Sequence, residues 1–148
     1  MNPRRWLIAH APALFARWCT PNAAELGLLG EEFAARHLRA QGWQLLGRRL
    51  RTSAGEVDLF AREGSELVCV EVKTSRSASV PRPRGMDPAR ARTNDQPGER
   101  WKPAQAGRLA RAAQQLAREQ GASRARLDLV EVVLAAGSAR VELRHRRG

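Results

Sequence analysis

The chain has 148 residues, 43% of them hydrophobic, which suits one domain with a hydrophobic core and excludes disorder throughout. Its formal net charge of +11 favours a polyanionic partner, because each phosphate that Lys or Arg neutralises releases counterions. No apolar run approaches the length of a membrane helix. The cysteines, Cys19 and Cys69, form neither a disulfide framework nor a zinc motif, and Cys69 lies in an apolar run where a buried thiol is expected. We therefore expect a cytoplasmic protein that binds nucleic acid and no membrane.

Residues 1–22 carry arginines ahead of a short apolar stretch that His10 and Pro12 interrupt. That stretch is too short for the apolar region of a signal peptide. We expect a basic, loosely ordered arm here, then a single domain over 23–145 and a basic tail at 146–148.

A first helix is expected over 23–40, because Asn22 can cap its start. At 100° steps its apolar residues form a broad arc, and Glu31 projects into that arc. A carboxylate there either lies at the edge of the apolar face or is held by a cation. Its neighbour Glu32 falls on the polar stripe, so we expect it to be exposed, at the i,i+4 spacing for an ion pair with Arg36.

Five strands are expected from alternation, apolar runs and flanking turn residues, at 43–51, 56–61, 67–74, 126–134 and 140–144. The second and third of these form a hairpin. A second helix begins near Pro103, a favoured first-turn residue, and ends at Gly121. The segment 75–100, rich in Pro, Arg, Ser and Gly, is expected to be a long mobile loop.

Acidic residues and one lysine come together in the expected hairpin. Alternation puts Glu71 and Lys73 on one face of their strand, and pairing can bring Asp58 onto the same face. The helix that carries Glu31 could pack over that face. Carboxylates so close repel one another unless a hard divalent cation, Mg²⁺ or Mn²⁺, lies between them. Such an ion can stabilise a phosphoryl group under attack by water, and a lysine beside it can position that water. Against this stands the plain interpretation that Glu-x-Lys occurs on many half-exposed strands.

Five segments, taken in order, carry a resemblance to a known family. They are Gly-Leu-Leu-Gly-Glu at 27–31, Ala-Ala-Arg-His-Leu at 34–38, Gly-Glu-Val-Asp-Leu at 55–59, Val-Glu-Val-Lys-Thr at 70–74 and Arg-Leu-Asp-Leu-Val at 126–130. With them the chain resembles the YraN family of small bacterial proteins. That family in turn resembles the PD-(D/E)XK nucleases, particularly archaeal-type Holliday-junction resolvases. The resemblance implies a restriction-endonuclease-like α/β/α core, with a central mixed β-sheet flanked by helices.

The resemblance also implies roles for particular residues. The catalytic residues it implies are Glu31, Asp58, Glu71 and Lys73, the three acids being the metal ligands. Glu56 matches the strand motif, and we expect it to support the site rather than to bind metal. Where related proteins carry a lysine near the second helix, this sequence has Gln105, with Lys102 nearby, and we expect both to support the site or to contact substrate.

The leading expectation is a Mg²⁺-dependent endonuclease that hydrolyses phosphodiester bonds in DNA, including branched or damaged DNA. Resolvase-type cutting would require two sites and therefore a homodimer. The main alternative is a catalytically silent, nuclease-like module that binds nucleic acid, for example as a repair adaptor. A third is a basic scaffold whose partner is a protein.

Overall fold

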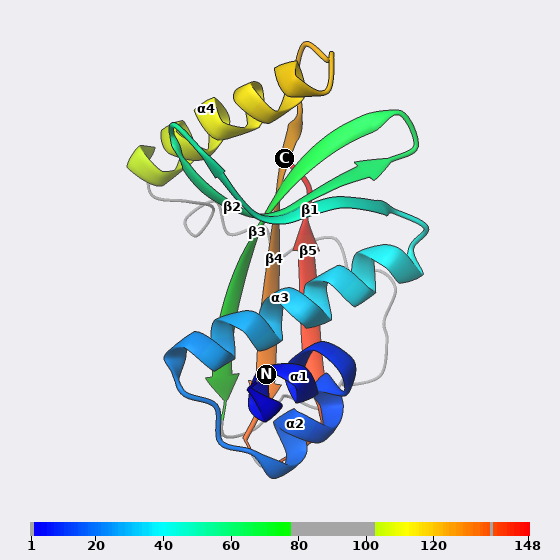
Figure 1. Cartoon of the computed structure of the whole chain (residues 1–148), viewed down its shortest axis with the longest axis vertical. Coiled ribbons are helices and arrows are strands. Elements are labelled where there is room, and N and C mark those ends of the chain that lie inside the picture. Colours follow the sequence, from blue (N-terminus) through cyan, green and yellow to red (C-terminus); the bar gives the residue numbers. More distant parts are fainter. Residues whose placement is uncertain (1, 78–102, 137) are drawn as a thin grey trace, which may run out of the picture.

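The structure is a computed structural model that describes residues 2–77, 103–136 and 138–148. Its centre is a five-stranded sheet in the order β1-β2-β3-β4-β5 (Figure 1). Strands β3 and β4 are parallel, and the other neighbouring pairs are antiparallel. The strands are β1 (Gln44–Thr52), β2 (Gly55–Glu63), β3 (Glu66–Ser77), β4 (Arg126–Ala135) and β5 (Val141–Arg146). The sheet is therefore mixed, as predicted.

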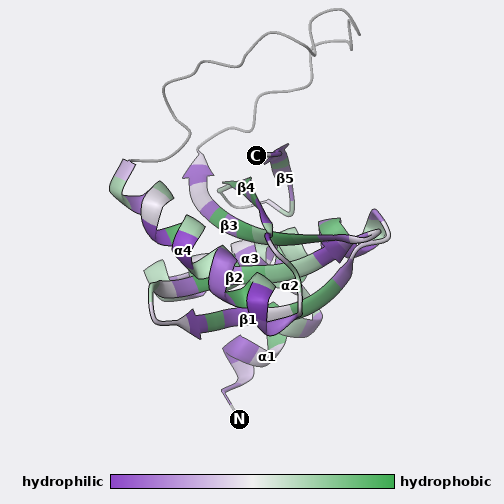
Figure 2. Cartoon of the chain, turned by 90° about the horizontal axis from the view of Figure 1, so that it is seen from above, coloured by the Kyte–Doolittle hydropathy of each residue, from purple (hydrophilic) through white to green (hydrophobic). Residues whose placement is uncertain are grey.

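One long helix covers each face of this sheet. Helix α3 (Ala23–Ala40) packs on the face that carries Val68 and Val70, whereas α4 (Pro103–Glu119) packs on the face that carries Cys69. Burial raises the pKa of the Cys69 thiol to about 12, so it acts as a small core residue, as predicted. The middle of β3 is hydrophobic and its far end is hydrophilic (Figure 2). The predicted α/β/α core around a mixed sheet is confirmed.

The ends of α3 follow directly from the sequence. The Asn22 side chain accepts a hydrogen bond from the Glu25 amide at 2.9 Å, and the Glu25 carboxylate accepts one from the Asn22 amide at 3.0 Å. This reciprocal cap satisfies two amides that the first turn leaves free. Gly42, with φ of +83°, turns the chain out of the helix into β1.

The N-terminal residues differ from the prediction of a loosely ordered arm. They form α1 (Pro3–His10) and α2 (Pro12–Trp18), both in contact with α3. A proline starts each helix, where its missing amide is not needed. Phe15 is fully buried, and the Arg4 guanidinium donates to both oxygens of Glu25, at 2.6 and 2.9 Å. The prediction is wrong here because these side chains have partners on α3, which local sequence does not reveal.

The other predicted boundaries need smaller corrections. Strand β3 continues to Ser77, into the segment expected to be a loop, and the rest of that segment, 78–100, lies outside the described residues. The expected tail at 146–148 begins inside β5, and the Gly148 amide donates to Asp128 at 3.2 Å. Among the helices that the structure describes, none is long and apolar enough to cross a membrane.

Candidate active site

The candidate site lies where the sheet opens between two of its strands. Pairing of β2 with β3 extends as far as Leu59 and Val70 and stops there. One step further, the Asp58 carboxylate accepts a hydrogen bond from the Val72 amide at 2.8 Å. Beyond this point β2 stays paired with β1, and β3 with β4, so the β1–β2 hairpin curves away from the rest of the sheet (Figure 1). Asp58 therefore occupies the fork between the two parts of the sheet.

Glu71 and Lys73 enter the site from β3, on the face that α4 covers. Glu71 is buried, and its Oε1 atom accepts hydrogen bonds from Lys73 Nζ and from Gln105 Nε2, both at 2.9 Å. Gln105 belongs to the first turn of α4, so this contact ties the start of the helix to β3. The Lys73 side chain is 52% exposed, which leaves its ammonium group accessible beside the buried carboxylate.

Glu31 reaches the fork from the opposite face. The expectation that its helix packs over the face of Glu71 is wrong, because the apolar arc of α3 packs on Val68 and Val70 instead. Burial, then the negative charge of Asp58, raises the pKa of Glu31 to about 7. The charge of Asp58 thus acts on Glu31, although α3 and α4 lie on different faces of the sheet.

A glycine allows α3 to come this close to β3. A Cβ atom added at Gly30 would lie 1.8 Å from Thr74 Oγ1 and 2.8 Å from Thr74 Cβ, so no other residue fits without a shift. Because Gly30 immediately precedes Glu31, this contact fixes the depth at which the glutamate enters the fork.

Burial makes two acids of the cluster harder to ionise. Burial, with a contribution from the negative charges of Glu71 and Glu56, raises the pKa of Asp58 to about 6, against the lowering effect of the Val72 amide and of Lys73. Two of the three acids in the fork therefore resist ionisation, which a divalent cation would reverse.

Mg²⁺ fits this donor set as a partly hydrated ion. Among the described residues, no three His, Cys, Asp or Glu side chains are placed to hold a metal ion by themselves. Mg²⁺, however, usually binds through one or two carboxylates and keeps several waters, with phosphate oxygens completing its shell. Asp58 and Glu71 can supply such a pair of hard oxygen donors. The metal-ligand roles of Asp58, Glu71 and Glu31 stay predictions.

Arginines of β1 form a second layer that the sequence did not reveal. By register, Arg49 lies opposite Asp58, between the pairs Arg48–Leu59 and Leu50–Val57. Its φ of +48° is in the left-handed region, the one such value at a non-glycine residue in the described part of the chain. The Arg49 guanidinium pairs with Glu56 at 3.1 Å. Glu56 thus holds an arginine beside the acids, in keeping with the supporting role expected for it, which is still a prediction.

Glu32 differs from its predicted exposure. Its carboxylate is buried and pairs with Arg36 at 2.8 Å, as the spacing predicted, and also with Arg48 at 2.6 Å. The exposure was wrong because β1 brings Arg48 over this side of α3, and a helical wheel contains no information on neighbouring strands. The remaining predicted site residue, Lys102, lies outside the described residues.

A buried ionic network extends from Asp128, which is paired with Val70, toward the β2–β3 turn. Asp128 is fully buried and accepts hydrogen bonds from Arg126 Nε at 2.7 Å and from His145 at 2.8 Å. Burial alone would raise the pKa of Asp128, but the hydrogen bonds from His145 and Arg126 outweigh it and lower the pKa to about 2. Arg126 also pairs with Glu63 and Glu66 at the β2–β3 turn. Arg126 and Asp128 are two residues apart in β4 and share a face, whereas the other members of the network come from distant segments.

These features define a class of protein: an α/β/α fold whose mixed sheet opens around a cluster of carboxylates and a lysine. A family model described as "Uncharacterised protein family UPF0102" matches residues 30–132, and the chain belongs to this family. The matched range includes the fork and Gln105, whereas α1 and α2 lie outside it. The resemblance to the YraN family is thereby confirmed.

Individual relatives match over shorter stretches. A UPF0102 protein of Granulibacter bethesdensis is 57% identical over 51 residues, which is 34% of this chain and 32% of that protein. One of Caldicellulosiruptor saccharolyticus is 50% identical over 56 residues, 38% of this chain and 48% of the relative. One of Syntrophomonas wolfei is 51% identical over 53 residues, 36% and 46% of the two chains. These matches therefore cover about a third to a half of the relatives' own length.

Proposed function

We propose that this chain is a metal-dependent endonuclease that hydrolyses phosphodiester bonds in DNA, including branched or damaged DNA. The observation that carries the proposal is the meeting of Asp58, Glu71 and Lys73 at the fork, with Lys73 Nζ 2.9 Å from Glu71 Oε1. Burial, and after it the negative charge of Glu71, raises the pKa of Asp58, and a half-exposed lysine lies beside the pair. Carboxylates with raised pKa values gather at functional sites. They are suited to chemistry on a phosphate group.

Each residue of the fork has a distinct part in this proposal. Mg²⁺ or Mn²⁺, held by Asp58 and Glu71 with Glu31 as the third oxygen donor, would offset the negative charge of the phosphoryl group. The Val72 amide fixes one Asp58 oxygen, and Gln105 fixes Glu71 Oε1. The ammonium of Lys73 can donate a hydrogen bond to the attacking water or to a phosphate oxygen.

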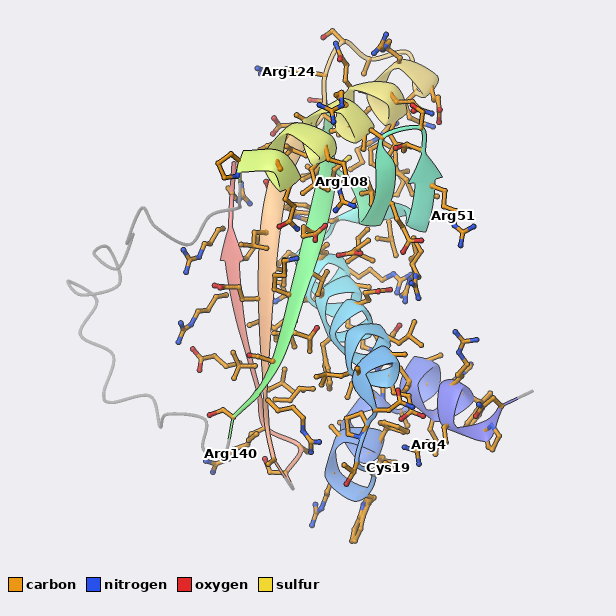
Figure 3. The ribbon with its side chains drawn as sticks, turned by 90° about the vertical axis from the view of Figure 1, so that its left-hand side faces the viewer. Arg4, Cys19, Arg51, Arg108, Arg124 and Arg140 are labelled. Atoms are coloured by element: carbon orange, nitrogen blue, oxygen red, sulfur yellow. The ribbon has the colours of Figure 1, made fainter. Side chains whose placement is uncertain are left out.

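Arginines on α4 support a nucleic-acid partner. Arg108, Arg111 and Arg118 follow an i, i+3, i+10 spacing, which places them along one side of the helix. Arg108 lies against Gly55 at the start of β2, and Figure 3 shows Arg108 with Arg51 and Arg124 around this end of the molecule. Within the described residues, none of the three α4 arginines has a carboxylate within ion-pair distance. Their charge is free for phosphate contacts.

The test is cleavage of supercoiled, single-stranded and four-way-junction DNA with Mg²⁺, Mn²⁺ or EDTA. The parent should cut at least one substrate only with metal. Asp58→Asn and Lys73→Met should each lower the rate by roughly 100-fold or more, the scale of losing a positioned catalytic group. The matched control is Glu142→Gln, which removes a partly exposed carboxylate on β5 paired with Arg144. Parental cleavage by both site variants would refute the proposal.

One observation favours a second candidate. Because no three described side chains are placed to hold a metal ion, a module that binds DNA without cutting it also fits. That candidate predicts salt-dependent binding with no metal-dependent cleavage of any substrate. Resolvase-type cutting further predicts a dimer on DNA, which sedimentation can measure.

A further inference from the structure

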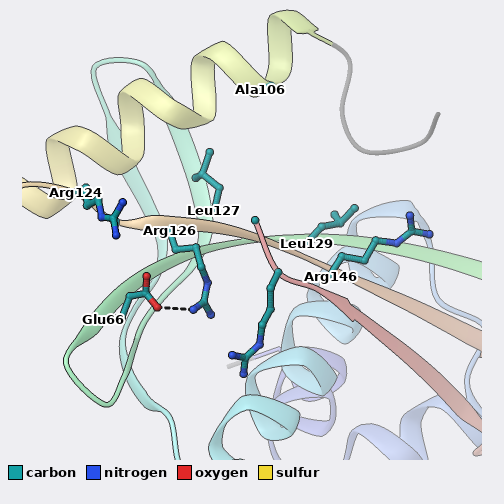
Figure 4. A pocket seen from close by; sticks show the side chains of 10 residues that line it. Glu66, Ala106, Arg124, Arg126, Leu127, Leu129 and Arg146 are labelled. Carbon is teal, nitrogen blue, oxygen red and sulfur yellow. Dashed lines mark hydrogen bonds and ion pairs between the residues drawn. The ribbon is translucent and has the colours of Figure 1, made fainter. Parts of the chain in front are cut away.

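A hollow of about 540 Å³ lies beside the fork, between α4 and the edge of the sheet formed by β4 and β5 (Figure 4). Two of its lining residues are neighbours of the candidate site. Leu129 is paired with Glu71 across the β3–β4 ladder, and Ala106 follows Gln105 in α4. Because paired residues of adjacent strands point to the same face, the Leu129 and Glu71 side chains lie next to each other. The hollow therefore lies beside Glu71, although Asp58, Glu71 and Lys73 are not among its lining residues.

The lining combines an apolar surface with arginines at its ends. Leu127 and Leu129 of β4 form one side, opposite α4, with Arg124 at one end and Arg146 at the other (Figure 4). Arg126 turns away toward Glu66, with which it pairs. The space thus offers flat apolar contacts and guanidinium groups together.

The charge of this lining is not fully compensated. Arg146 pairs with Glu131 at 3.1 Å, and Arg126 is surrounded by carboxylates. In the part of the chain that the structure describes, exposed Arg124 pairs with no carboxylate. An occupant with an apolar body and one negative charge complements this arrangement.

We propose that the hollow binds one unpaired nucleotide of the DNA substrate, with its base against Leu127 and Leu129 and its phosphate at Arg124. A base has two apolar faces, and guanidinium groups and apolar side chains both stack on such faces. The volume lies in the range of sites that enclose small ligands, roughly 300–1,000 Å³. A base inside a duplex is covered by its neighbours and cannot enter, so the nucleotide must be unpaired.

This assignment rests on the proposed function, because the base at Leu129 would lie next to Glu71 of the proposed site. It deepens that function by naming the substrate class: DNA with an unpaired nucleotide beside the scissile bond. Such a nucleotide occurs in a bulge or a flap, and a fully paired duplex has none.

The experiment measures binding of the full chain in EDTA, where no metal-dependent cleavage occurs. Two labelled duplexes are compared by fluorescence anisotropy, one fully paired and one with a single unpaired 2-aminopurine nucleotide. The bulged duplex should bind roughly 5-fold more tightly, the lower end of the range for a base stacked on an aromatic ring, because the lining residues are aliphatic or charged. The 2-aminopurine emission should change on binding.

Two variants act on the hollow in different ways. Arg124→Ala removes the free guanidinium from an exposed position, and Ala106→Phe fills the space from the half-buried side of α4. Each should reduce the preference for the bulge to less than about 2-fold while changing affinity for the paired duplex much less. The control is Arg118→Ala, at a residue that does not line the hollow, and it should weaken binding of both duplexes alike.

Equal affinity for the two duplexes, a preference that survives both variants, or no binding of either duplex would overturn the assignment. Its failure is distinguishable from that of the proposed function. A bulge preference without any cleavage would support nucleotide binding in the hollow and refute the endonuclease activity. Cleavage without a bulge preference would support the endonuclease activity and refute nucleotide binding in the hollow.

Discussion

Two glycines of α3, three residues apart, should respond to alanine with opposite signs. A Cβ atom at Gly27 would meet nothing within 4 Å. Gly27→Ala should therefore stabilise the protein by roughly 0.5–1 kcal/mol, the difference in helix propensity. At Gly30 the same atom would lie 1.8 Å from Thr74 Oγ1 and 2.8 Å from Thr74 Cβ.

The magnitude of the second change follows from what can move. Rotation of the Thr74 side chain displaces Oγ1 but not Cβ, so α3 itself must shift away from β3. Overpacking of this kind costs about 1–3 kcal/mol, from which the gain in helix propensity is subtracted. Because the gain in helix propensity is the same in both variants, they should differ by the overpacking cost, about 1–3 kcal/mol. For a chain of this length that corresponds to roughly 3–10 °C in Tm.

Thermal and urea unfolding followed by circular dichroism measure this difference. Because a shift of α3 also withdraws Glu31 from the fork, Gly30→Ala should lower the cleavage rate and Gly27→Ala should preserve it. If Gly30→Ala is as stable as Gly27→Ala, the close approach of helix and strand is refuted, and with it the reason given for the depth of Glu31.

Three further outcomes are expected. Asp128→Ala should lower the free energy of unfolding by roughly 1–3 kcal/mol, because His145 loses the buried carboxylate that it contacts. Arg126 keeps its ion pairs with Glu63 and Glu66. Since the folded pKa of Asp128, about 2, lies below its ordinary value of 3.8, the parent should lose about 2 kcal/mol of stability as the pH falls from about 4 to 2. The variant should lack this acid-dependent loss in urea titrations, and an identical acid limb would contradict the network. Arg111→Ala and Arg118→Ala should each reduce the salt dependence of DNA binding by about one unit of slope, whereas unchanged slopes would exclude phosphate contacts there. About 10 mM Mg²⁺ should raise the Tm of the parent and leave that of Asp58→Asn unchanged; equal shifts in both proteins would argue against this ion site.

The elements of the fold were predictable where the signal is local. The Asn22 cap fixes the start of α3, and alternation correctly put Glu71 and Lys73 on one face of β3. Strand ends were less accurate: β3 extends from Glu66 to Ser77 rather than over 67–74, because its pairing with β4 continues past the apolar run.

The rest of the site depends on contacts between distant segments. Glu32 is buried because Arg48 of β1 pairs with it, and Glu31 is influenced by Asp58 although its helix lies on the other face of the sheet. The periodicity of hydrophobic residues predicts neither contact. The position of Arg49 opposite Asp58 likewise follows from strand register, which a single strand's sequence does not determine.

The fork depends on which acceptor the Val72 amide hydrogen-bonds to. The Val72 N–H can serve either the Asp58 carboxylate, as it does, or further strand pairing. If β2 and β3 paired beyond Leu59 and Val70, the Asp58 carboxylate would lose its hydrogen bond from the Val72 amide. The sequence of the site would be unchanged. The proposed cleavage activity therefore depends on where the pairing of β2 with β3 ends. A substitution that extends this pairing would abolish the activity without changing any acid of the site.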